Sequence, residues 1–150
     1  MQPGLAVNRV SQKEAYMPNM NVTFTDLIGV PFVNGGRNPN SGLDCWGLST
    51  EVFSRYGIQL PDYKISCEDA SKINKHVDRQ KQFWRRCEGE IPIPALVVIR
   101  FSVYCDHTGV YIGNGRFIHT RKGVGVNIDR VDSPAWSKRI EGFYVPEVIK

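Results

Sequence analysis

The segment from Cys105 to Thr120 constrains the fold of this chain more than any other, because it predicts a β-hairpin. Its sequence is Cys-Asp-His-Thr-Gly-Val-Tyr-Ile-Gly-Asn-Gly-Arg-Phe-Ile-His-Thr. The β-branched and aromatic residues favour strands, and Asn114-Gly115 favours a tight turn between them. The chain therefore contains at least one pair of antiparallel strands, and this pair carries two histidines.

The register of the hairpin decides whether His107 and His119 lie together. A two-residue loop of Asn114-Gly115 alone would place the two side chains on opposite faces of the sheet. We predict instead a three-residue loop, residues 113–115, in which Gly115 is left-handed and forms a bulge. The pairs expected in that register are Ile112 with Arg116 and Gly109 with His119. Both histidines then share one face, and the small Gly109 leaves space between them.

A cysteine stands where a glycine-rich loop leads into a predicted helix. The run Gly35 to Leu48 is Gly-Gly-Arg-Asn-Pro-Asn-Ser-Gly-Leu-Asp-Cys-Trp-Gly-Leu, with Asp44 as the expected N-cap. The apolar stripe of this helix comprises Trp46, Leu48, Val52, Phe53 and Tyr56, and Gly57 is expected to end it. Unpaired N–H groups and the macrodipole at a helix N-terminus lower the pKa of a thiol. Cys45 can therefore be a nucleophile, although a buried structural cysteine is the alternative.

These residues supply the components of thiol acyl transfer. His107 would take the proton from Cys45 and later deliver it to the leaving amine. His119 would fix the tautomer of His107 by accepting its other N–H. A backbone N–H at the start of the Cys45 helix would stabilise the oxyanion.

Several short motifs then resemble the NlpC/P60 family of cysteine peptidases. They are Gly29 to Gly36, Asp44 to Leu48, Tyr56 to Pro61, His107 to Gly115 and Phe117 to His119. The likeness covers roughly residues 24–146. It implies a papain-like α+β fold in which N-terminal helices carrying the nucleophile pack on a central antiparallel β-sheet. It also implies a Cys-His-His triad formed by Cys45, His107 and His119.

The resemblance implies that the substrates are stem peptides of bacterial peptidoglycan, typically at the bond from D-γ-glutamate to a diamino acid. Substrate contacts are expected from Asp44, Trp46, Phe32 and Gly109. Phe32 stands where many members have a tyrosine, and Trp46 where serine is common, so the preferred peptide is expected to differ. The run Asp-Cys-Trp-Gly-Leu looks most like modules of bacteriophage and prophage tails, whose other proteins are then possible partners.

Composition agrees with this interpretation. We expect an N-terminal arm, residues 1–23, and one catalytic domain, residues 24–150, which is an ordinary size for one core. A formal net charge of +4 names no nucleic-acid partner, and no stretch approaches the ~20 apolar residues of a membrane helix. The N-terminus lacks the apolar segment of a signal peptide. We therefore expect synthesis in a bacterial cytoplasm and action on the cell wall as a tail-associated protein.

Three alternatives remain open at this point. The chain could be a catalytically inactive structural tail or interaction module with the same fold. It could be a thiol amidase or acyl transferase acting on another amide. It could also bind zinc through Cys45, Cys105, His107 and His119, which have suitable ligand types. We expect no metal or other cofactor, and reduced thiols at Cys67, Cys87 and Cys105.

The segment between the two motif halves predicts a helix from Ser66 to Glu88. Ser66 and Asp69 resemble a capping box, and His76 is expected at the surface. The predicted buried side comprises Ile73, Val77, Phe83 and Trp84. Residues 123–128 and 142–145 are expected to complete the antiparallel sheet.

Overall fold

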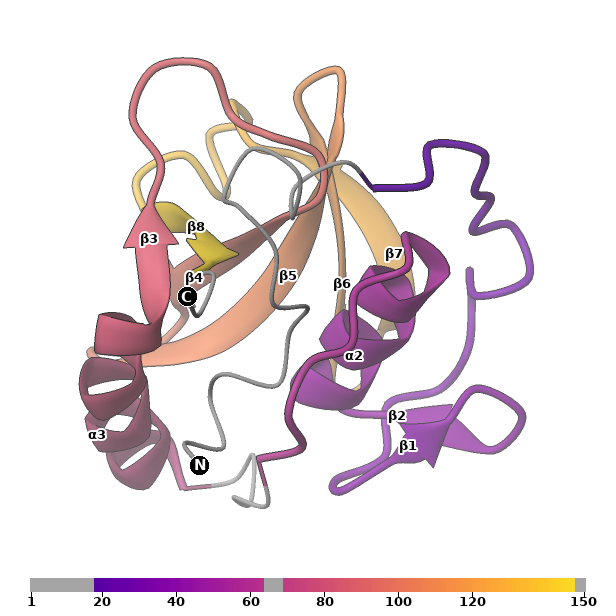
Figure 1. The fold of residues 1–150 in the computed structure, drawn as a ribbon. Coiled ribbons are helices and arrows are strands. Elements are labelled where there is room, and N and C mark those ends of the chain that lie inside the picture. Colours follow the sequence, from indigo (N-terminus) through magenta and orange to yellow (C-terminus); the bar gives the residue numbers. More distant parts are fainter. Residues whose placement is uncertain (1–17, 64–68, 148–150) are drawn as a thin grey trace.

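The computed structural model describes residues 18–63 and 69–147 and has two layers (Figure 1). A six-stranded antiparallel sheet has the order β3-β8-β4-β5-β6-β7, and two helices cover one of its faces. The helices are α2 (Cys45–Arg55) and α3 (Ala70–Gln80), and a 3-10 turn, η2 (Lys81–Phe83), follows α3. The sheet comprises β3 (Trp84–Arg86), β4 (Ala95–Arg100), β5 (Cys105–Gly113), β6 (Arg116–Arg121), β7 (Gly125–Arg130) and β8 (Ile140–Pro146). A separate ribbon pairs β1 (Arg37–Asn38) with β2 (Gly42–Leu43). The predicted α+β fold is confirmed.

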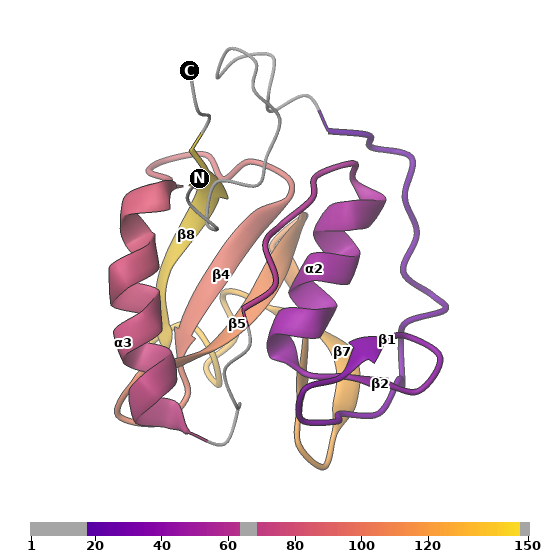
Figure 2. The same cartoon turned by 60° about the horizontal axis from the view of Figure 1, so that its bottom comes forward.

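Strand β4 lies at the centre of the sheet and is buried on both faces. Leu96 and Val98 join the large cluster beneath α2 and α3, whereas Val97 and Ile99 join a second cluster on the opposite face. A continuous apolar run is typical of a strand covered on both sides. Figure 2 shows α3 over the β8 side of the sheet and α2 over the β7 side. The opposite face has its own core, which includes Phe117 and Trp136.

Helix α2 forms as its sequence predicts. Asp44 is the N-cap, and its Oδ1 accepts a hydrogen bond of 2.8 Å from the Gly47 N–H. The apolar stripe buries Leu48, Val52 and Phe53 against the sheet. Gly57 follows the last turn with a φ of 92°, a left-handed conformation that glycine adopts without strain.

The β5–β6 hairpin has the expected register through a different turn. The loop is Asn114-Gly115 alone, with φ angles of 56° and 73°, and Gly113 pairs with Arg116. The predicted pairing of Ile112 with Arg116 is therefore wrong. Ile112 is the extra residue of a bulge, since the register shifts between Tyr111 and Gly113. The bulge compensates for the shorter loop, so the histidines still share a face.

The predicted helix over Ser66 to Glu88 is only partly confirmed. Asp69 caps α3 by accepting a bond of 3.1 Å from the Lys72 N–H, whereas Ser66 lies outside the described residues. The helix ends at Gln80, and Trp84 begins β3 instead of extending it. Strand β3 pairs with β8, and the Trp84 ring packs edge-on against Phe53 at 6.2 Å. The gain from sheet pairing and core burial outweighs local helix propensity here.

The remaining strands complete the sheet, as predicted. Strand β7 pairs with β6, and β8 lies between β3 and β4. At the other end of the chain, the Asn19 N–H donates to the Tyr56 carbonyl over 2.9 Å, so the described part of the predicted arm packs on the end of α2. Within residues 18–63 and 69–147, no helix has the length and apolarity needed to cross a membrane.

Candidate active site

Strands β5 and β6 bring the two predicted histidines into contact. Nε2 of His107 lies 2.8 Å from Nδ1 of His119, and both rings are buried. The Trp136 ring lies 4.7 Å from the His119 ring and 6.2 Å from the His107 ring, between centroids. Packing against this indole holds both imidazoles in place. The prediction that they share a face and form a ring-to-ring hydrogen bond is confirmed.

Cys45 is the first residue of α2, and α2 packs on β5 through the residue that follows His107. Thr108 Oγ1 donates to the Cys45 carbonyl over 3.5 Å and lies 3.3 Å from Ser49 Oγ. The thiol is therefore next to the strand that carries His107. Its hydrogen-bonding neighbours are Thr108 and the backbone of Trp46. Among the described residues, no hydrogen bond joins the thiol to either imidazole.

Burial shifts the pKa values of both Cys45 and His107 away from the ionised forms. Burial raises the pKa of Cys45 to about 11, the Asp44 carboxylate acts in the same direction, and hydrogen bonds from Thr108 oppose it only in part. Burial also lowers the pKa of His107 to about 3, with contributions from His119 and Arg121. Desolvation of a charged group outweighs the helix N-terminus at this position. In this state burial favours the neutral form of both groups, a direction opposite to the lowering of the thiol pKa that the helix N-terminus alone predicts.

A carboxylate that the sequence analysis missed extends the histidine pair. Asp129 Oδ2 lies 2.7 Å from Nε2 of His119 and accepts a bond of 2.9 Å from Nδ2 of Asn127. Burial alone would raise the pKa of Asp129, but the hydrogen bonds from His119 and Asn127 bring it below the usual value. Burial lowers the pKa of His119. Asp129 is thus ionised next to a neutral His119. The only sequence signal was its position directly after the strand predicted over residues 123–128, which in the structure extends to Arg130.

Asp44 uses its side chain to hold the start of α2. Besides the Gly47 N–H, its carboxylate accepts a bond of 3.0 Å from the Gly35 N–H and one of 2.6 Å from Nη1 of Arg37. The side chain is 2% exposed. The carboxylate predicted to contact substrate is therefore occupied by its own loop, and in this structure it positions Cys45.

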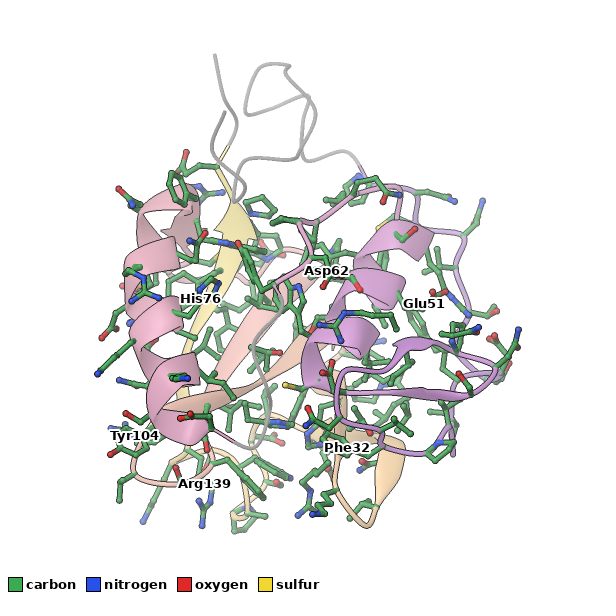
Figure 3. The ribbon with its side chains drawn as sticks, turned by 90° about the horizontal axis from the view of Figure 1, so that it is seen from below. Phe32, Glu51, Asp62, His76, Tyr104 and Arg139 are labelled. Carbon is green, nitrogen blue, oxygen red and sulfur yellow. The ribbon has the colours of Figure 1, made fainter. Side chains whose placement is uncertain are left out.

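Trp46 lines a pocket that borders Cys45. Its Nε1 donates to the Pro61 carbonyl over 2.9 Å, and its ring stacks on Tyr63 with a centroid distance of 4.8 Å. The pocket lies between α2, α3 and the sheet, and its lining is mostly apolar. His76 also lines it, from α3 (Figure 3). The prediction of a surface His76 is wrong, because its ring is half-buried against Tyr63 at 4.3 Å.

The structure gives Phe32 and Gly109 roles in the backbone: Phe32 pairs with Leu43, and Gly109 lets β6 approach β5. Phe32 forms an isolated parallel bridge with Leu43, just before the α2 N-cap, and its side chain is half-buried (Figure 3). A Cβ atom on Gly109 would lie 2.9 Å from the Ile118 carbonyl oxygen and 3.0 Å from Cβ of His119. The absence of a side chain at Gly109 therefore leaves room for His119, as predicted, and β6 fills that room. The glycine is needed because β6 approaches so closely.

The family model of NlpC/P60 matches residues 29–145, which include the nucleophile loop, α2 and the whole hairpin. The chain belongs to the NlpC/P60 family. Two of the solved structures that are similar to it agree in fold. An NlpC/P60 protein from Bacillus cereus has a TM-score of 0.58 and 20% identity, and the match covers 78% of this chain and 35% of that one. An NLP/P60 lipoprotein-like protein from Staphylococcus aureus has a TM-score of 0.56 and 19% identity, covering 97% and 45%.

Two NlpC/P60 relatives have named activities. The murein DD-endopeptidase MepS/murein LD-carboxypeptidase of Escherichia coli K12 is 30% identical over 117 residues, which cover 77% of this chain and 55% of that protein. The gamma-DL-glutamyl hydrolase of Bacillus subtilis is 33% identical over 120 residues, covering 77% and 26%. The chain thus spans about half of the first relative and about a quarter of the second.

The cysteines of this NlpC/P60 chain are described in part. Cys45 and Cys87 are buried free thiols. Cys67 and the side chain of Cys105 lie outside the described part of the structure. The zinc alternative would require Cys105. Among the described side chains, no group of three or more His, Cys, Asp or Glu residues is arranged to hold a metal ion.

Proposed function

We propose that this chain is a cysteine endopeptidase that hydrolyses peptide bonds in the stem peptides of bacterial peptidoglycan. Cys45 is the nucleophile, His107 the general base and His119 the residue that orients it. The observation that carries the proposal is the hydrogen-bonded series His107–His119–Asp129, on a strand whose Thr108 contacts the Cys45 carbonyl at the start of α2. The named murein endopeptidase among the relatives supports the choice of substrate.

The ionised Asp129 dictates the tautomers of both histidines. Because Asp129 can only accept, His119 Nε2 carries the proton in that 2.7 Å bond. His119 Nδ1 is then an acceptor, so Nε2 of His107 donates to it across 2.8 Å. This arrangement leaves Nδ1 of His107 unprotonated and available as a base. The orienting role of His119 follows from this order of donors and acceptors.

The reaction then proceeds in two acyl-transfer steps. Nδ1 of His107 takes the thiol proton as Sγ of Cys45 attacks the carbonyl carbon, since neither group is ionised beforehand. The protonated His107 gives that proton to the leaving amine as the C–N bond breaks, and a thioester remains. Water, deprotonated by His107, hydrolyses the thioester. The Cys45 N–H has no acceptor within α2 and is the proposed oxyanion donor, while Phe32 contributes no hydroxyl.

The proposal extends to the setting in which the enzyme acts. We assign it to a phage or prophage tail, made in the bacterial cytoplasm and acting on the cell wall, with other tail proteins as partners. The support is the run Asp44 to Leu48, in which Trp46 follows the nucleophile. Co-purification of the chain with tail particles would test this part separately from catalysis.

Digestion of defined muropeptides tests the catalytic proposal. Wild-type protein should release products that mass spectrometry assigns to one peptide bond, and Cys45→Ala should release none while keeping its thermal unfolding midpoint. His107→Ala should also be inactive, whereas His119→Ala should keep residual activity. Equal digestion by wild type and Cys45→Ala would remove Cys45 from the mechanism.

The buried, neutral thiol favours one alternative, an inactive tail or interaction module with the same fold. That module would hydrolyse neither muropeptides nor other amides, and iodoacetamide would not label Cys45 in the presence of muropeptides. Hydrolysis of a different amide, with muropeptides left intact, would instead identify a thiol amidase or acyl transferase.

A further inference from the structure

The pocket beside Cys45 is lined mainly by apolar side chains from α3 and the sheet. Helix α3 contributes Ile73 and Val77, and β4 contributes Leu96 and Val98. The volume of the pocket is about 80 Å³, against about 150 Å³ for an apolar cavity that holds benzene. The pocket therefore suits a short side chain of a few heavy atoms.

The rim of this pocket is accessible, whereas its sheet side belongs to the core. Trp46, Ile73 and Val77 are only half-buried, but Leu96 is buried. Figure 2 shows α2 and α3 apart, with β4 and β5 between them. A group that enters between the two helices can cover apolar surface that the protein itself leaves partly exposed.

Among the described residues that line the pocket, His76 alone has a shielded polar atom without a hydrogen-bond partner, its Nε2. Other polar groups of the lining are engaged within the protein. The Tyr63 hydroxyl donates to Oε1 of Gln80 over 3.0 Å, and the Tyr144 hydroxyl donates to Glu141 over 2.8 Å. A buried polar atom without a partner costs about 1–3 kcal/mol. A ligand group that bonds to Nε2 removes this cost.

The charges around His76 favour an uncharged ligand. Burial and the nearby Arg79 lower the pKa of His76 from the ordinary 6.5, so its ring is neutral at pH 7. A neutral imidazole has one donor and one acceptor nitrogen. The carboxylates of Asp44 and Asp106 line the same pocket and disfavour an anion there. The Tyr63 ring packs edge-on against the imidazole at 4.3 Å and holds it in place.

We propose that this pocket binds a short side chain of the substrate that ends in a carboxamide, and that Nε2 of His76 hydrogen-bonds to that group. A carboxamide has both a donor and an acceptor, so it matches either tautomer of His76. The aliphatic stem of the side chain contacts Ile73 and Val77. Because Cys45 borders the pocket, this side chain belongs to a residue close to the scissile bond. The inference rests on the proposed function for the role of Cys45.

The binding of three small probes tests the inference without requiring turnover. The probes are the N-acetyl methylamides of asparagine, leucine and aspartate, whose side chains have nearly the same shape but differ in polarity. In magnetic-resonance titrations of Cys45→Ala protein, the asparagine probe should shift the ring signals of His76. It should bind about 10-fold more tightly than the leucine probe. The aspartate probe should bind most weakly, because it brings a further negative charge next to Asp44 and Asp106.

Variants of His76 separate the hydrogen bond from the shape of the pocket. His76→Phe keeps a ring but removes Nε2, so the asparagine and leucine probes should bind equally. His76→Gln keeps a hydrogen-bonding group and should recover part of the preference for asparagine. Lys75→Gln is the matched control, since Lys75 is an exposed neighbour on α3 and its variant should keep the full preference. Unchanged unfolding midpoints would show that these variants are folded.

Three results of the titrations would overturn the inference. They are equal binding of the asparagine and leucine probes by Cys45→Ala protein, an unchanged preference in His76→Phe, and binding of none of the probes. A different result would separate this inference from the proposed function. Asparagine-selective binding by a wild-type protein that hydrolyses no muropeptide would contradict the proposed peptidase and leave the carboxamide pocket standing.

Competition with muropeptide digestion gives a second readout. The asparagine probe should raise the KM of wild-type protein and leave kcat unchanged, because the pocket borders Cys45. In His76→Phe, the asparagine probe should raise KM no more than the leucine probe does. A decrease in kcat at constant KM would mean that the probe binds away from the substrate, and it would overturn the inference.

Discussion

At the scale of single residues, the site depends on one negative charge, that of Asp129. Its carboxylate orders the two imidazoles by accepting from His119, and His119 in turn accepts from His107. The buried Cys45 and His107 are both neutral because desolvation disfavours their charged forms. In the proposed mechanism, the substrate therefore binds before the proton moves from Cys45 to His107. Such a site protects its thiol from ionisation and oxidation in the resting state.

Asp129→Asn tests the ordering role of this carboxylate. The asparagine is nearly isosteric but neutral, so it stabilises the required tautomer of His119 less well. We expect kcat/KM on a muropeptide to fall by about 10- to 100-fold with little change in the unfolding midpoint. The control is Asp132→Asn, which alters an exposed aspartate paired with Arg130 and should leave kcat/KM unchanged. Identical kinetics for the two variants would contradict the role of Asp129.

At the scale of secondary-structure elements, two contacts place the proposed catalytic groups. The β5–β6 ladder sets the distance between the histidines, and the loop around Asp44 sets the start of α2. Both contacts depend on backbone atoms that approach closely. Changes at these positions should therefore affect stability and activity together.

Gly109→Ala tests the approach of β6 to β5. The added Cβ would meet the Ile118 carbonyl oxygen at 2.9 Å, which is backbone and cannot move aside. We expect a loss of about 1–3 kcal/mol in the free energy of unfolding, measured by urea titration, and weaker activity. Gly142→Ala on β8 is the control, because the three atoms nearest its Cβ would belong to the exposed end of the Arg86 side chain, which bonds to Glu141, and not to the backbone. That variant should stay within about 0.5 kcal/mol of wild type.

The two helix N-caps, Asp44 and Asp69, differ in the number of groups that donate hydrogen bonds to them. Asp44→Ala removes the cap of α2 and also leaves Arg37 and the Gly35 N–H without their buried acceptor. We expect a loss of about 2–4 kcal/mol, the sum of a cap and an unsatisfied charged hydrogen bond. Asp69→Ala at the exposed cap of α3 should cost about 0.5–1 kcal/mol. Chemical denaturation of both variants measures the two losses in the free energy of unfolding. Equal losses would mean that Asp44 acts only as a cap.

At the scale of the whole molecule, the two cores on opposite faces of the sheet bury titratable groups that are exposed in the unfolded chain. His107 has a pKa of about 3 when folded against an ordinary 6.5, so the unfolded chain binds the proton first as pH falls. Cys45 has a pKa of about 11 against 9.0, so the unfolded chain loses its proton first as pH rises. The stabilising contribution of both groups is therefore fully present between these ordinary values.

The free energy of unfolding should accordingly be highest between about pH 6.5 and 9 and fall on both sides. Urea unfolding from about pH 4.5 to 6.5 checks the acid side, and His107→Gln should show a smaller slope because it cannot bind the proton. His76→Gln is the comparison, since His76 is only half-buried and should change the slope less. An unchanged slope in His107→Gln would show that other groups cause the acid loss.

Local features of the sequence were enough to predict much of this protein. The N-cap Asp44, the apolar stripe of α2 and the strands of the hairpin each follow from neighbours in the chain, and short motifs identified Cys45, His107 and His119 as candidate site residues. Caps, side-chain periods and turn residues act over a few positions, and so they are visible in a sequence. The prediction that the histidines meet is confirmed, although it depended on a three-residue loop and the structure reaches the same register through a two-residue loop and a bulge.

What only the tertiary structure decided depends on contacts between residues far apart in the chain. Trp84 joins a strand because β8 is there to pair with it, and the bulge at Ile112 restores a register that the short turn would have shifted. Asp129 reaches His119 only after β7 has paired with β6. The high pKa of Cys45 arises from burial beneath the assembled fold. The desolvation of a buried group and the pairing of strands both depend on residues that are far apart in the chain. No local pattern in the sequence can therefore predict them.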